Sequence, residues 1–147
     1  MMLLNKNMLG GLIGAAVLNL IHTVAKRMDP LAPEVDKLGE EALSKAVSAA
    51  GLEPPTGSRL VAATLGADIA SNAALYSLIG IGGKKHMLAR GVLVGAAVGL
   101  GTLTIPGKAG LDDTPVKKSR RTEIMTVAWY VLGGLAAAAA IKAMRKG

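Results

Sequence analysis

Residues 124–141 read IMTVAWYVLGGLAAAAAI, an apolar run without a charged side chain. At a helical rise of about 1.5 Å per residue, this run extends for about 27 Å, close to the hydrocarbon thickness of a bilayer. Its small residues do not alternate with polar ones, and it lacks the aromatic girdles of a transmembrane β-barrel. The stretch therefore predicts a membrane-spanning helix.

The whole chain shares this apolar character. Of its 147 residues, 51% are hydrophobic and only 18% are charged, whereas about 25% of the residues of a soluble domain are charged. The absence of cysteine excludes a disulfide framework, and the length fits one membrane domain over residues 1–147. The composition also excludes a disordered or collagen-like chain and favours a bilayer as part of the solvent.

Three more apolar blocks have the length of a membrane span, at residues 8–25, 60–81 and 87–105. Together with 124–141 they predict an all-α bundle of four transmembrane helices, the fold of a multi-pass protein of the cell membrane. The first block is expected to be an uncleaved span, because no small-x-small cleavage site follows it. The second block contains Asp68, whose insertion cost of about 2.5–3.5 kcal/mol nearly cancels the gain from its Leu, Ile and Val residues. We therefore expect this helix to depend on partners that bury Asp68.

The polar connection between the first two spans has its own helical pattern. Val35, Leu38 and Val47 recur at helical spacing, opposite Asp36 and Lys37. This pattern predicts an amphipathic helix over about residues 34–50, lying at the interface or folded over the mouth of the bundle.

Small residues at four-residue spacing predict close helix packing. The third span carries Gly91, Gly95 and Gly99 on one face. In lipid, where no hydrophobic force acts between helices, such stripes let backbones approach and gain dispersion contacts. The stripe predicts either packing within the chain or a homodimer through these three glycines.

Polar side chains inside the spans are costly, so each one is a candidate functional residue. Helical spacing gives the first, second and fourth spans one polar face each, and antiparallel threading brings these faces to one half of the membrane. They predict a polar cavity with a cationic rim. The candidates are His22 and Asp68 as catalytic residues, and Asn19, Lys26, Arg59, Asn72, Arg120, Arg121 and Tyr130 as substrate-binding residues.

Such a cavity fits the headgroup of a membrane lipid or another amphipathic anion. If the protein is an enzyme, His22 would transfer a proton and Asp68 would orient it. One alternative is a structural or accessory subunit in which the polar faces only fix helix register. Another is a small proton-coupled transporter in which Asp68 exchanges a proton for a cation.

The sequence motifs give no reason to expect further ligands. We expect no metal and no cofactor, because the sequence shows neither metal-ligand spacing nor a nucleotide-binding loop. The net charge of +7 lies at span ends, where basic residues are common, so we expect no nucleic-acid partner. Basic residues do not decide the membrane orientation, since their number and their density favour opposite sides.

Two segments are similar to small, uncharacterised bacterial multi-pass membrane proteins. They are residues 19–39, NLIHTVAKRMDPLAPEVDKLG, and residues 66–76, GADIASNAALY, together about a fifth of the chain. The resemblance implies an origin in a bacterial membrane, with the inner membrane as the expected location, and it implies no particular activity.

Overall fold

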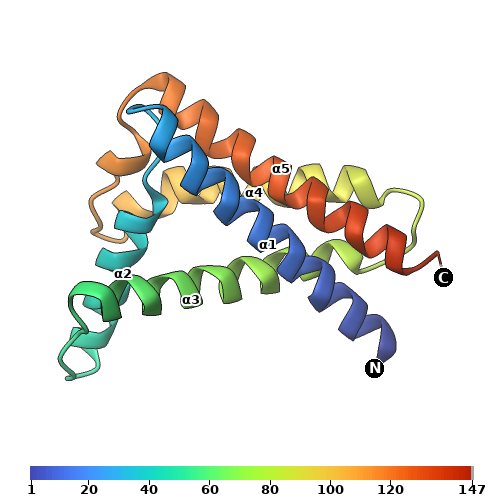
Figure 1. The fold of residues 1–147 in the computed structure, drawn as a ribbon, viewed down its shortest axis with the longest axis horizontal. Coiled ribbons are helices and arrows are strands. Elements are labelled where there is room, and N and C mark those ends of the chain that lie inside the picture. The colour runs from blue at the N-terminus through green and yellow to red at the C-terminus, as the bar shows by residue number, and fades with distance from the viewer. Residues whose placement is uncertain (147) are drawn as a thin grey trace.

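The computed structural model describes residues 1–146 and shows an all-helical chain (Figure 1). Residues 1–146 form no strand. Their helices are α1 (Met2–Met28), α2 (Val35–Ala49), α3 (Gly57–Ser77), the 3-10 helix η1 (Leu78–Gly80), α4 (Met87–Lys108), the 3-10 helix η2 (Thr114–Val116) and α5 (Arg120–Met144). The predicted all-α class is confirmed.

Three helices within residues 1–146, α1, α4 and α5, are long and apolar enough to cross a membrane, so the prediction of four such helices is wrong. The exception is α3, in which Asp68 and Asn72 lower the mean hydropathy. The predicted block 60–81 is also not one α-helix, because α3 ends at Ser77 and the chain tightens into η1. Nevertheless, α3 packs against α1, which crosses it at an angle (Figure 1).

The four long helices pack in the order α3, α1, α5, α4. Helix α1 packs along both α3 and α5, and α5 also packs along α4, whereas α3 and α4 make few contacts. Helix α2 contacts α3 and η2, at the end of the molecule far from both termini (Figure 1). The weak contact between α3 and α4 leaves room for a cavity that α2 covers.

Close packing of α4 on α5 depends on the predicted glycine stripe. Gly91, Gly95 and Gly99 are buried, and a Cβ on Gly95 would lie 2.5 Å from the carbonyl oxygen of Tyr130. A Cβ on Gly91 would lie 2.7 Å from the carbonyl oxygen of Gly134. The stripe is therefore used within the chain, and a homodimer through these three glycines would have to displace α5.

The main core lies where α1, α3 and α5 meet. Its fully buried members include Leu18, Tyr76, Ile79 and Ile141. The Tyr76 hydroxyl donates a hydrogen bond of 2.7 Å to the backbone carbonyl of Tyr130. This bond satisfies a polar group that would otherwise be costly inside the bundle.

Helix α2 folds over the mouth of the bundle, one of the two placements that the sequence left open. Its Leu38 forms a small buried cluster with Leu103 of α4 and Val116 of η2. Lys45 donates to the backbone carbonyl of Gly110 at 2.7 Å. Apolar and polar contacts together attach α2 to the α4–α5 connection.

Glu34, immediately before α2, is the centre of an ion-pair cluster that holds this helix in place. Its carboxylate lies 2.7 Å from Lys118, 3.0 Å from Lys37 and 3.7 Å from Lys26. Its backbone N–H donates to the carbonyl of Pro115 at 3.0 Å. The cluster joins the end of α1, the start of α2 and the α4–α5 connection.

This cluster predicts a loss of stability in acid. The hydrogen bond from Lys118, followed by that from Lys37, lowers the pKa of Glu34 from 4.5 to about 2. Because the pKa is lowered in the folded state, the stabilisation is fully present above the unfolded value and is lost as the pH falls through the folded value. We expect the protection of the α2 amides from exchange, relative to the intrinsic exchange rate at each pH, to fall between about pH 4.5 and pH 2 in the detergent-solubilised protein.

The matched variants are Glu34→Gln and, as a control, Glu53→Gln at an exposed loop position. The Glu34→Gln protein should exchange faster at pH 7 and respond less to acid, whereas Glu53→Gln should behave like the unchanged protein. An acid response in Glu34→Gln as steep as that of the unchanged protein would contradict this role of Glu34.

Candidate functional site

A cavity of about 730 Å³ lies among the helices beneath α2. It is within the range of about 300–1,000 Å³ that is usual for small-molecule sites. Among the residues that line it are Asn19, His22 and Lys26 of α1, Thr64 and Asp68 of α3, and Tyr130 of α5. The structure thus brings together five residues that the sequence predicted for one site, Asn19, His22, Lys26, Asp68 and Tyr130.

Asp68 is the central polar residue of the cavity. The side-chain amide of Asn19 on α1 donates to its Oδ2 at 2.8 Å, and that of Asn72, one turn further along α3, donates to its Oδ1 at 3.1 Å. Both donors are neutral, so they satisfy hydrogen bonds of the carboxylate without balancing its charge. Asn72 thereby supports the site through Asp68 without lining the cavity.

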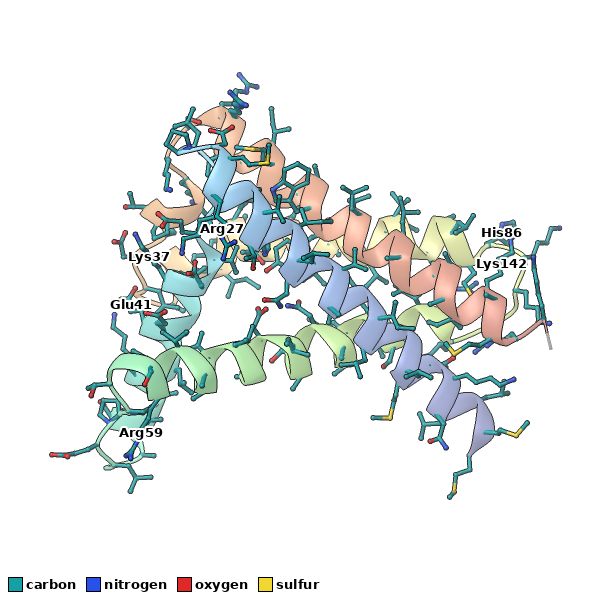
Figure 2. The ribbon with its side chains drawn as sticks, viewed as in Figure 1. Arg27, Lys37, Glu41, Arg59, His86 and Lys142 are labelled. Carbon is teal, nitrogen blue, oxygen red and sulfur yellow. The ribbon has the colours of Figure 1, made fainter. Side chains whose placement is uncertain are left out.

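The basic residues predicted for the site do not pair with Asp68. The Lys26 ammonium is 2.5 Å from the Asp36 carboxylate and also faces Glu34. Arg59 is exposed at the start of α3 and does not line the cavity (Figure 2). Within residues 1–146, the Asp68 carboxylate makes no ion pair with Lys, Arg or His.

His22 lines the same cavity as Asp68, but its hydrogen bonding is not that of an oriented catalytic pair. Its Nε2 is buried and has no hydrogen-bond partner within residues 1–146. Its ring packs edge to face against Tyr130, with ring centroids 5.7 Å apart. Because the oxygens of Asp68 accept from amides instead, the predicted orientation of His22 by Asp68 is not part of the site.

The two remaining arginines of the prediction are separate from the cavity. Arg120 borders a shallow pocket on the outside of α4 and α5, together with Glu123. Arg121 lies 2.6 Å from Asp29, so it ties the start of α5 to the segment after α1. Neither residue contributes to a rim around Asp68.

Sequence reasoning missed the acidic contribution of α2. Asp36 and Glu40 line the cavity from above, along with Arg27 at the end of α1. The lining therefore includes three carboxylates and two cations, namely those of Asp68, Asp36 and Glu40 and those of Lys26 and Arg27. The lining is not the cationic one that the sequence predicted, because α2 folds onto the mouth and brings its carboxylates with it.

Thr64 also lines the cavity and was not predicted, although the sequence pattern could have revealed it. It lies four positions before Asp68, hence on the same face of α3. The residue is 5% exposed, and its Oγ1 has no hydrogen-bond partner within residues 1–146. With Nε2 of His22, it adds a second unpaired polar atom to the wall of the cavity.

The rest of the wall is apolar. Val61 and Leu65 of α3, Leu38 of α2 and Pro106 of α4 line the cavity, and the side chains of Val61 and Leu65 are exposed. Among residues 1–146, no three His, Asp or Glu side chains are grouped closely enough to hold a metal ion. The arrangement combines a polar centre with an apolar wall that reaches the protein surface.

Comparison of the chain with protein-family models, with curated proteins and with solved structures finds no match.

Proposed function

We propose that this chain is a multi-pass protein of a bacterial inner membrane that binds a membrane lipid or a similar amphipathic molecule. The ligand would carry an ammonium group, which would lie beside Asp68 in the cavity beneath α2. The observation that supports this proposal is the Asp68 carboxylate in this cavity, which accepts hydrogen bonds from Asn19 and Asn72 and has no positive partner within residues 1–146.

The charge of the lining favours a cationic or zwitterionic headgroup over the anion suggested by the sequence. A charged carboxylate is costly in apolar surroundings and is stabilised by a nearby cation. Each oxygen of Asp68 has a further lone pair, so an ammonium group can donate to it beside the amides. An anionic headgroup would instead meet the carboxylates of Asp68 and Glu40, which make no ion pair within residues 1–146. A zwitterionic headgroup could also place its phosphate at Arg27, which makes no ion pair within residues 1–146.

The apolar part of the ligand has a path out of the cavity. Val61 and Leu65 of α3 line the cavity and are also exposed at the protein surface, and α3 makes few contacts with α4. An acyl chain between these two helices would cover apolar surface while its headgroup stays beneath α2. We propose binding rather than catalysis, because no carboxylate within residues 1–146 accepts a hydrogen bond from His22.

The same carboxylate favours a second function, proton-coupled transport of a cationic amphiphile. Asp68 would then hold a proton when the cavity is empty and exchange it for the ammonium group. The cationic rim that the sequence predicts would repel a cationic substrate, but Lys26 is paired with Asp36. Both functions require the binding step that the following experiment measures.

Cysteine labelling tests the cavity directly, because the chain has no cysteine of its own. In the Thr64→Cys variant the new thiol would line the cavity. We expect the ratio of its modification rates by the cationic reagent aminoethyl methanethiosulfonate and the anionic sulfonatoethyl reagent to be higher than the same ratio at the exposed control thiol. Dodecylammonium should slow the modification about tenfold, whereas dodecyl sulfate should not.

Ala63→Cys, at an exposed neighbouring position on α3, serves as the control. Its modification should show no protection by dodecylammonium. If Thr64→Cys also shows no protection, or reacts faster with the anionic reagent, the cavity does not bind a cationic amphiphile. The alternative of a structural or accessory subunit would then remain.

A further inference from the structure

The positive charge of this protein is concentrated at one end. The ten Asp and Glu side chains lie at Asp68 or at the end that carries α2, and none lies at the end with the two termini and the α3–α4 connection. That second end, here called the basic end, carries Lys6 of α1, Lys84, Lys85 and Arg90 around the start of α4, and Lys142, Arg145 and Lys146 around the end of α5. His86 and Lys142 mark it in Figure 2, opposite Lys37 and Glu41.

The two ends differ in how their cations are satisfied. At the α2 end, Lys26, Lys37, Lys45, Lys117, Lys118 and Arg121 form ion pairs with carboxylates. These pairs balance most of the charge of that end. The net charge of +7 is thus the charge of the basic end, where residues 1–146 provide no carboxylate.

Backbone carbonyls and one amide hold several cations of the basic end in place. Arg145 donates to Asn7 Oδ1 at 2.7 Å and to the carbonyl of Gly80 at 2.5 Å. Arg90 donates to the carbonyl of Ile79 at 2.9 Å, and Lys6 donates to that of Met144 at 2.8 Å. These acceptors are neutral, so they fix the positions of the cations without cancelling their charge.

We infer that the basic end binds the anionic headgroups of phospholipids at the membrane surface. The cations stand at the ends of α1, α4 and α5, the three helices that are apolar enough to cross a membrane, so they lie at the depth of the headgroups. A lysine or arginine near an anionic lipid surface contributes about fivefold to association. This inference does not depend on the proposed function of the cavity, which lies at the other end.

The inference also orients the protein. Anionic lipids are concentrated in the cytoplasmic leaflet, so the basic end would face the cytoplasm and the cavity beneath α2 would lie toward the opposite face. A membrane-impermeant maleimide should therefore label Ser48→Cys in intact cells and spare His86→Cys, both at exposed positions. The reverse pattern would overturn this orientation.

Lipid selectivity tests the binding itself. Electron spin resonance of spin-labelled lipids should show that the protein in phosphatidylcholine vesicles prefers phosphatidylglycerol by about fivefold or more. Removing three of the seven charges of the basic end, by Lys85→Gln, Lys142→Gln and Lys146→Gln together, should lower the preference severalfold, because four cations remain. High salt should also lower it, because exposed charges are screened.

The matched control removes three exposed lysines from the α2 end, with Lys37→Gln, Lys45→Gln and Lys108→Gln together. This variant should keep the preference for phosphatidylglycerol. Absence of any preference in the unchanged protein, or an equal loss in both triple variants, would overturn the inference. The measurement on the unchanged protein tests the preference for phosphatidylglycerol even if a triple variant does not fold.

Discussion

Replacing Gly95 by alanine is expected to destabilise the protein by about 1–3 kcal/mol, the usual cost of forcing an extra carbon into a packed interior. The new Cβ would lie 2.5 Å from the Tyr130 carbonyl oxygen and 2.7 Å from Cα of Val131. Both neighbours are backbone atoms of α5, so neither can turn away as a flexible side chain would. The helices α4 and α5 would have to separate along much of their contact.

Gly66→Ala is the matched control for this prediction. Gly66 lies within α3, and a Cβ there would meet nothing within 4 Å. Since alanine is favoured over glycine inside a helix by about 0.5–1 kcal/mol, this variant should be slightly more stable than the unchanged protein. Unfolding of both variants in detergent measures the difference. Equal stabilities would contradict the close packing of α4 on α5 through glycine.

The main features of the fold follow from apolar length and from small residues. The blocks at 87–105 and 124–141 correspond to α4 and α5, because charged residues and turns bound them in the sequence. The glycine stripe predicted close packing but not its partner. Four-residue spacing gives a face to one helix and contains no information about which other helix meets it.

Five of the predicted site residues, Asn19, His22, Lys26, Asp68 and Tyr130, line one cavity, whereas the three predicted arginines, Arg59, Arg120 and Arg121, do not line it. Asn19 and Asp68 lie in different spans, and the sequence brought them together because antiparallel helices place them at one depth. The arginines were misplaced for a different reason. A basic residue at a helix end can turn toward the cavity, toward an acid or toward water, and Arg121 turns to Asp29.

The charge of the cavity lining could not be predicted from the sequence pattern. Whether α2 lies flat at the interface or folds over the bundle is decided by tertiary contacts such as those of Glu34 with Lys118. Once α2 is folded over the mouth, Asp36 pairs with Lys26 and removes the cation that was expected for Asp68. This single placement changes the expected ligand from an anion to a cation.

Asp68→Asn is therefore expected to weaken the binding of an ammonium amphiphile by about tenfold or more. A hydrogen bond to a charged group contributes about 1.5–3 kcal/mol, and each 1.4 kcal/mol corresponds to a factor of ten. Asparagine has nearly the same shape as aspartate, so the substitution removes the charge while the cavity keeps its volume. Asp112→Asn is the control, because Asp112 is exposed in the α4–α5 connection and does not line the cavity.

The most direct test is the affinity of dodecylammonium for the protein in lipid nanodiscs, measured for the unchanged chain, Asp68→Asn and Asp112→Asn. The structure predicts a loss of about tenfold or more in Asp68→Asn alone. Equal affinities in all three proteins would show that the Asp68 carboxylate does not receive a cationic group, and would contradict the proposed site.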